Sequence, residues 1–167
     1  MKNLANEIFV RTKQPDDTRR RNYVIDYAIK IPQSFEVKID NRTGDINVES
    51  INDSITANLV TGQTTLNSIN ASTVAKVTTG NIISKQALPE NGTINMTVTT
   101  GNIELNIPAD ISGKFSARVT TGNVRMDSTL TLESAIETAN TLTGTLEGGA
   151  GQVTLAVTTG DIRINRL

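Results

Sequence analysis

The stretch Val98-Thr99-Thr100-Gly101-Asn102-Ile103 decides the fold, because its pattern returns along the whole chain. In every copy threonine precedes glycine, and in the clearest copies asparagine or aspartate and then an aliphatic residue follow. Such self-similarity, with a period of about twenty residues, is typical of solenoids, in which each repeat covers the apolar face of its neighbour. The glycines of the seven copies, which we expect to form structural turns, are Gly44, Gly62, Gly80, Gly101, Gly122, Gly144 and Gly160.

Aliphatic residues alternate with polar ones on both sides of the glycine. A period of two predicts two strands per repeat, each with one buried face. The column three residues before glycine includes Val77, Val98, Val119 and Val157. The column five residues before it includes Ala75, Met96, Ala117, Ala139 and Leu155. Two residues after glycine stand Ile46, Ile82, Ile103, Val124, Leu146 and Ile162.

The residues of the turn have a clear physical purpose. Glycine adopts positive φ at no steric cost, and asparagine or aspartate tolerates similar conformations while bonding its own backbone. We expect the threonine before each glycine to face the interior, in phase with the valine two residues earlier. Stacked threonines could then pair their hydroxyl groups between repeats.

These patterns predict an all-β protein, a right-handed parallel β-helix or β-roll solenoid of about seven short coils. Neighbouring strands of such a stack lie about 4.8 Å apart. Corresponding residues of successive coils become neighbours, and one outward column then alternates in sign, which avoids like charges on neighbouring strands and supports the register. That column consists of Glu104, Arg125, Glu147 and Arg163.

Two regions of the chain follow from this interpretation. Residues 1–22 are expected to form an N-terminal strand and a mobile polar loop, and residues 23–167 the solenoid. The stretch Tyr27–Pro32 matches Ile103–Pro108, so a first partial coil is expected near Tyr27. An N-terminal aromatic cap is favoured over a sugar-stacking platform, because a solenoid must close its core at each end. The four aromatic residues concerned are Phe9, Tyr23, Tyr27 and Phe35.

The chain stops at Leu167, directly after the last turn, without a recognisable cap. An open parallel edge is a template for further strands. We therefore expect either self-association through the open C-terminal end or a further C-terminal segment that covers it.

Composition excludes several classes of function. The net charge of −1 and the scattered basic residues give no sign of nucleic-acid binding. Without cysteine or histidine, the chain has no disulfide, thiol nucleophile or histidine-based metal site, and we expect no cofactor. No run is long and apolar enough for a transmembrane segment or a signal peptide. The chain is thus either cytoplasmic or a trimmed piece of a cell-envelope or extracellular protein.

The stretch Tyr27–Pro32, followed by Phe35-Glu36-Val37-Lys38-Ile39, and the serial Thr-Thr-Gly-Asn-Ile phrase resemble the bacterial putative adhesin family. Members are β-strand-repeat proteins of largely unassigned function. The resemblance covers the chain from about residue 23 onward. It implies an envelope or secreted protein that attaches to surfaces, and it supplies no catalytic motif.

The function expected from these observations is a non-enzymatic structural or adhesive module of the cell surface. Its ligand would be a protein or a glycan. Three alternatives stay open: a self-assembling scaffold subunit, a carbohydrate-active β-helix, and an ice-binding solenoid with a flat threonine array. Against the last, Val60 and Leu142 interrupt the array. The candidate contact surface comprises Asn81, Asn102, Asn123, Thr78, Thr99, Thr120 and Thr158.

Overall fold

A computed structural model describes residues 10–12, 24–146 and 150–167 of the chain. The chain divides into two compact units, Met1–Lys30 and Ile31–Leu167. All the strands described lie in the second unit, and the described residues contain no helix. The protein is therefore all-β, as the alternation of aliphatic residues predicts.

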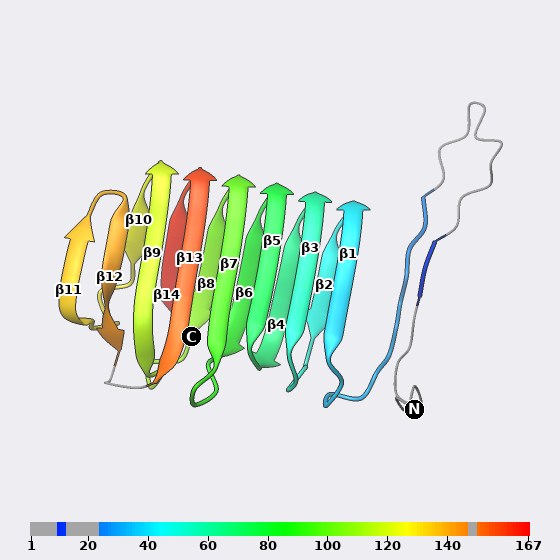
Figure 1. Cartoon of the computed structure of the whole chain (residues 1–167), viewed down its shortest axis with the longest axis horizontal. Coiled ribbons are helices and arrows are strands. Elements are labelled where there is room, and N and C mark those ends of the chain that lie inside the picture. Colours follow the sequence, from blue (N-terminus) through cyan, green and yellow to red (C-terminus); the bar gives the residue numbers. More distant parts are fainter. Residues whose placement is uncertain (1–9, 13–23, 147–149) are drawn as a thin grey trace, which may run out of the picture. The chain divides into compact units, whose positions relative to one another are not determined.

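The strands form two sheets (Figure 1). The eight-stranded sheet contains, in spatial order, β1 (Val37–Thr43), β3 (Ile55–Thr61), β5 (Thr73–Thr79), β7 (Thr93–Thr100), β13 (Gly151–Thr159), β9 (Gly113–Thr121), β12 (Thr141–Leu146) and β11 (Glu133–Thr138). The six-stranded sheet contains β10 (Val124–Met126), β14 (Ile162–Arg166), β8 (Ile103–Ile107), β6 (Ile82–Ala87), β4 (Thr64–Asn70) and β2 (Ile46–Glu49). Neither sheet closes on itself, so each has two edge strands.

Each glycine turn joins a strand of the larger sheet to a strand of the smaller one. We call such a pair of strands a rung and name it by its strands, for example β7–β8. Neighbouring rungs pair in parallel, with glycine turns in register: Thr79 of β5 lies opposite Thr100 of β7. The described residues form six rungs of this kind. The hairpin β11–β12 follows them at one end and pairs antiparallel with β9.

The rungs do not follow the order of the sequence. The last rung, β13–β14, lies between β7–β8 and β9–β10, so that β13 pairs with both β7 and β9. Strand β12 already occupies the other edge of β9, which leaves the last rung no parallel edge beyond it. The prediction of an open edge at the C-terminus is therefore wrong, because the C-terminal rung has a neighbour on each side.

The same insertion overturns the predicted charge column. Arg163 pairs with Glu104 on one side and with Arg125 on the other, so two arginines are neighbours. The expected sequence of alternating signs depended on stacking in sequence order. Glu147 lies outside the described residues.

The seventh expected turn does not form at Gly144. This glycine lies inside β12, opposite Phe115 of β9 in an antiparallel ladder. Ala139, which the repeat places in an apolar column, is exposed. Both residues belong to the chain reversal that builds the hairpin β11–β12, and this reversal removes them from the column pattern.

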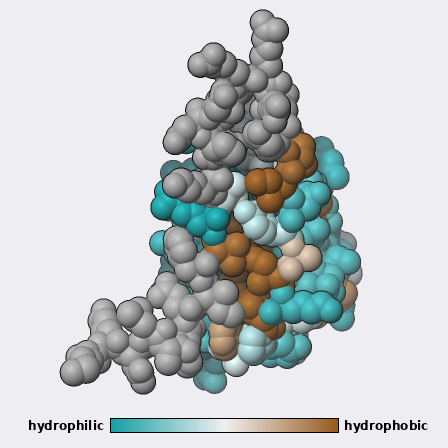
Figure 2. All heavy atoms as spheres, turned by 90° about the vertical axis from the view of Figure 1, so that its right-hand side faces the viewer, coloured by the Kyte–Doolittle hydropathy of each residue, from teal (hydrophilic) through white to brown (hydrophobic). Residues whose placement is uncertain are grey.

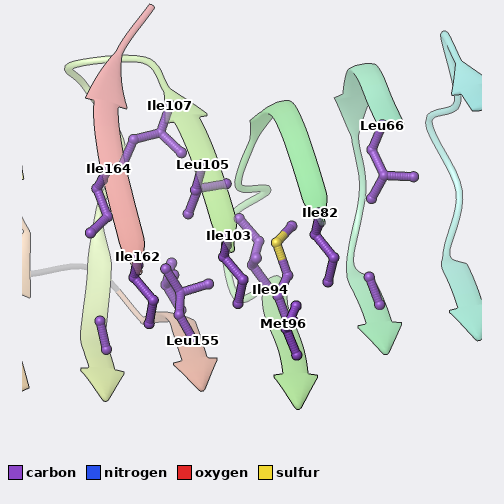
Figure 3. Packing of buried hydrophobic residues seen from close by; sticks show 14 of the residues in the cluster. Leu66, Ile82, Ile94, Met96, Ile103, Leu105, Ile107, Leu155, Ile162 and Ile164 are labelled. Atoms are coloured by element: carbon purple, nitrogen blue, oxygen red, sulfur yellow. The ribbon is translucent and has the colours of Figure 1, made fainter. Parts of the chain in front are cut away.

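The hydrophobic core lies between the two sheets, where the aliphatic columns point (Figure 3). Val77, Val98 and Val119 are 3%, 0% and 1% exposed, which confirms the predicted inward face of the larger sheet. From the smaller sheet, the corresponding residues are Ile82, Ile103 and Ile162, each with 0% of its surface exposed. Burying one such side chain contributes about 1.5–3 kcal/mol.

The expected first coil at Tyr27–Pro32 is not seen, because no strand begins before Val37 in the described residues. Tyr27 is 54% exposed and Phe35 is half-buried, whereas Phe9 and Tyr23 lie outside the described residues. Tyr27 belongs to the first unit and Phe35 to the second, so the aromatic cap stays a prediction. Figure 2 views the molecule from the right-hand side of Figure 1 and shows hydrophobic residues exposed there among hydrophilic ones.

Candidate functional site: the threonine and glycine corner

The corner between the two sheets is built from stacked glycines. Six of the seven predicted turn glycines have positive φ, between 109° and 137°. The backbone N–H of Gly101 donates to the carbonyl of Thr159 at 2.9 Å, and that of Gly160 donates to the carbonyl of Thr121 at 2.9 Å. The predicted turns are thus confirmed at Gly44, Gly62, Gly80, Gly101, Gly122 and Gly160.

The residues after four of the glycines form a ladder of hydrogen bonds over adjacent rungs. Asn81 Oδ1 accepts a hydrogen bond from the backbone N–H of Asn102 at 2.9 Å, and Asn102 Oδ1 accepts one from Asp161 at 2.9 Å. Asp161 Oδ1 in turn accepts one from Asn123 at 2.9 Å. These side chains were expected to bond their own backbone. They bond the next rung instead, because parallel stacking at strand spacing brings the neighbouring amide within reach.

Two columns of threonine run beside this ladder. The threonines directly before glycine were expected to face the interior, but Thr79, Thr100, Thr121 and Thr159 are all exposed. The strand turns away from the core at this residue, which breaks the period of two. The threonines one residue earlier are exposed as expected.

The insertion of the last rung makes the outer threonine column continuous. In the stack it reads Thr78, Thr99, Thr158 and Thr120, on the adjacent strands β5, β7, β13 and β9. Leu142 does not interrupt it, because Leu142 lies in β12 and is only 3% exposed. Val60, 47% exposed on β3, ends the column on the other side.

The next outward column is neutral at its centre and basic at its borders. Thr97 on β7 lies opposite Ala156 on β13. Lys76 follows on β5, and Arg118 on β9. The outer face of the larger sheet therefore presents hydroxyl and methyl groups between two flanking positive charges.

A hollow of about 230 Å³ adjoins the ladder, and Asn102, Glu104, Asp161 and Arg163 are among its lining residues. Small-molecule sites usually measure about 300–1,000 Å³. Glu104 Oε1 accepts hydrogen bonds from the side-chain amides of Asn106 and Asn165, at 3.4 Å each. Since the Asp161 carboxylate accepts the backbone N–H of Asn123, both acidic groups of the hollow have structural partners.

No group of three or more acidic side chains is placed among the described residues to hold a metal ion. The pKa of Asp127 lies below its ordinary value, because the backbone N–H and the hydroxyl of Thr129 donate hydrogen bonds to its carboxylate. Asp127 is a half-buried residue at the start of a local turn, and Arg166 of β14 also lowers its pKa. Nor is there, in this part of the chain, a helix that could cross a membrane.

The core also contains polar residues that the sequence pattern did not predict. Thr64, Thr73 and Ser84 are fully buried, and Gln86 is 1% exposed. The Thr73 hydroxyl donates to Gln86 Oε1 at 3.0 Å, whereas Thr64 Oγ1, Ser84 Oγ and Gln86 Nε2 have no hydrogen-bond partner. The signal in the sequence is a polar residue in an otherwise aliphatic column, as at Thr64 two residues after Gly62.

Fold and corner together define an all-β protein of largely parallel sheets with a repetitive polar corner. Residues 8–163 match the family model described as "Domain of unknown function (DUF7330)", and the chain belongs to that family. Neither a curated protein nor a solved structure matches the chain. The family description says nothing about adhesion.

Proposed function

We propose that the protein is a non-enzymatic structural or adhesive module of the cell envelope or the cell exterior. In this proposal the six rungs form a parallel β-solenoid, right-handed as is usual for parallel crossovers. The solenoid would present one face of repeated chemistry to a surface ligand, a protein or a glycan. The alternative is a self-assembling scaffold subunit, in which copies of the chain bind one another instead of a surface ligand.

The observation that carries the proposal is the regular polar corner on four adjacent rungs. Two exposed threonines stand before each of the glycines Gly80, Gly101, Gly160 and Gly122, and Asn or Asp stands after each. Backbone hydrogen bonds fix every turn to the next, so little conformational freedom is lost when the face binds. A flat array of this kind suits a ligand that is itself repetitive.

Retention on immobilised material tests the adhesive proposal. The protein, fixed to a surface, would be exposed to whole cells, glycan panels and matrix proteins. The variant Thr99→Lys/Thr158→Lys places two charges at the centre of the threonine column and is expected to abolish retention. The matched control Thr65→Lys alters an outward residue of the smaller sheet and should retain the same material. Uniformly absent binding by the unmodified protein would refute adhesion.

Ice binding is a second candidate, favoured by the continuity of the threonine array. Leu142 lies buried in the hairpin strand β12 and does not interrupt the column, and the insertion of β13 leaves four adjacent rungs of paired threonines. Regularly spaced hydroxyl and methyl groups on a rigid sheet can order water at the surface. Thermal hysteresis decides this candidate: a freezing point lowered below the melting point supports it, and loss of that gap in Thr99→Lys/Thr158→Lys would locate the face. Equal freezing and melting points would exclude it.

A further inference from the structure

We propose that the last rung, β13–β14, fills a strand-acceptor slot between β7–β8 and β9–β10, and that without this rung the slot closes by direct pairing of its two walls. The protein would then possess two self-consistent stacking orders, with the C-terminal rung as the element that selects between them. This inference does not depend on the proposed surface function.

The two walls of the slot match the inserted rung in one register. Val153 lies opposite Ile94 on one side and Phe115 on the other, and Val157 lies between Val98 and Val119 in the same way. Removing β13 would therefore leave two edges whose backbone groups and apolar columns already correspond. Shifting the walls together by one strand spacing, about 4.8 Å, would pair them without a change of register.

Charges on the smaller sheet favour the closed arrangement locally. In the observed order Arg163 separates Glu104 from Arg125 and has Arg125 as a like-charged neighbour. Direct pairing of β8 with β10 would place Glu104 opposite Arg125, an attractive pair. The inserted order must therefore gain its stability from burial of the extra rung. The core residues of that rung, Val153, Leu155 and Val157, are 1–3% exposed.

Sequence separation makes the closed arrangement the faster one to form. In the observed structure the ladder bonds of Asp161 span 59 residues to Asn102 and 38 residues to Asn123. Closing the slot would join Asn102 directly to Asn123 over a shorter loop. Contacts of low sequence separation form earlier, because less chain entropy is lost before they are made. Insertion of β13–β14 is then a late step that must reopen paired strands.

The other edge of β9–β10 gives the last rung no alternative position. Strand β12 pairs with β9 along its full length, and the backbone N–H of Val124 donates to the carbonyl of Ala139 at 3.0 Å. A C-terminal rung that arrives after these contacts cannot complete its hydrogen bonds on that side of β9–β10, whereas the slot offers it a parallel strand on each side.

Cysteine trapping tests the proposal cleanly, since the chain has no cysteine of its own. Asn95 and Ser116 both pair with Thr154, from opposite sides. In the observed order they lie about 9.6 Å apart, two strand spacings, which is beyond the reach of a disulfide. In the closed slot they would be direct neighbours. The variant Asn95→Cys/Ser116→Cys therefore cannot form this disulfide in the observed order and can form it in the closed order.

The variant would be refolded from denaturant in a glutathione redox buffer and, separately, folded first and then exposed to the same buffer. We expect at least ten times more monomeric disulfide product during refolding than in the folded protein, and more than in the chain held in denaturant with the same buffer. The control Asn95→Cys/Thr154→Cys should form its disulfide from the folded protein. Adding Gly160→Val, which obstructs insertion, should make the first disulfide form at equilibrium as well. Equal and negligible yields in all Asn95→Cys/Ser116→Cys samples, beside a reactive control, would overturn the proposal.

Discussion

The carbonyl oxygen of Gly101 stands where a Cβ atom on Gly160 would have to lie. Gly160 also has a φ of 136°, which L-amino acids with side chains rarely adopt. The two glycines therefore hold neighbouring rungs together by close backbone approach as well as by turn geometry.

Gly160→Ala is expected to lower the free energy of unfolding by about 2–6 kcal/mol, because backbone strain and overpacking add. Gly44→Ala is the matched control. Gly44 also has positive φ, but it lies in the terminal rung, and a Cβ there would meet Asn41 Nδ2 at 3.7 Å, an ordinary contact. The control should cost about 1–3 kcal/mol. Urea denaturation of both variants measures the difference, and equal losses would contradict the stacking of glycines.

Asn102→Ala removes the acceptor for the backbone N–H of Asp161 and the side-chain amide that donates to Asn81 Oδ1 at 3.3 Å. The free energy of unfolding should fall by about 1–3 kcal/mol, because each hydrogen bond usually contributes about 0.5–1.5 kcal/mol net. Asn123 ends the ladder: its N–H donates to Asp161, but its side chain accepts no ladder bond in the described residues. Asn123→Ala should therefore stay within about 0.5 kcal/mol of the unmodified protein. A larger loss at Asn123 than at Asn102 would show that the ladder does not stabilise the corner.

Thr64 offers a test of the buried polar groups. Its hydroxyl is fully buried without a hydrogen-bond partner, in line with Ile46 and Ile82 on the neighbouring strands. Thr64→Val keeps the shape and removes the unpaired group, so stability should rise by about 1 kcal/mol. Thr73→Val removes a hydroxyl that is bonded to Gln86 and should destabilise the protein. Thermal unfolding compares the two, and a loss at Thr64 would mean that its hydroxyl is satisfied in solution.

The inward-facing residues and most of the turns could be predicted from the sequence, because both depend on residue types within one repeat. The inward columns and six of the glycine turns follow from alternation and from the steric freedom of glycine, which are properties of single segments. Asn102 shows the limit of that reasoning. Its oxygen could bond its own backbone or the next rung, and only the spacing of the assembled strands favours the second.

The order of the rungs could not be predicted from the repeat, since identical columns fit together in any order. Rungs β7–β8, β9–β10 and β13–β14 carry the same apolar pattern, so each is a suitable neighbour for the others. The deciding element is the hairpin β11–β12, which breaks the repeat around Gly144 and occupies one edge of β9. Because Gly144 fits the repeat pattern, the sequence did not reveal that the repeat is interrupted there.

Arg125→Glu distinguishes the observed order from the sequential one. In the structure this change replaces the like-charged pair of Arg125 and Arg163 by an attractive one, and stability should rise by about 0.2–1 kcal/mol. In a sequential stack the same change would place two glutamates together at Glu104 and lower stability. Denaturation at low salt shows whether Arg125→Glu raises or lowers the free energy of unfolding. This change in stability should shrink in about 1 M salt, where the Debye length is about 3 Å.

The hydrogen bonds of Asp127 should make part of the protein's stability depend on pH in the acid range. The backbone N–H and the hydroxyl of Thr129 both donate to its carboxylate at 2.9 Å and lower its pKa below the ordinary 3.8. Because the folded pKa is the lower one, the carboxylate adds stability above the unfolded pKa and loses it as pH falls through the folded pKa. The unmodified protein should therefore exceed Asp127→Asn in melting temperature at pH 7, and the two should converge near pH 2. Each protein is measured at both pH values, so titration of other groups cancels in the comparison. A difference in melting temperature that persists unchanged into acid would show that the carboxylate charge has no part in holding this turn.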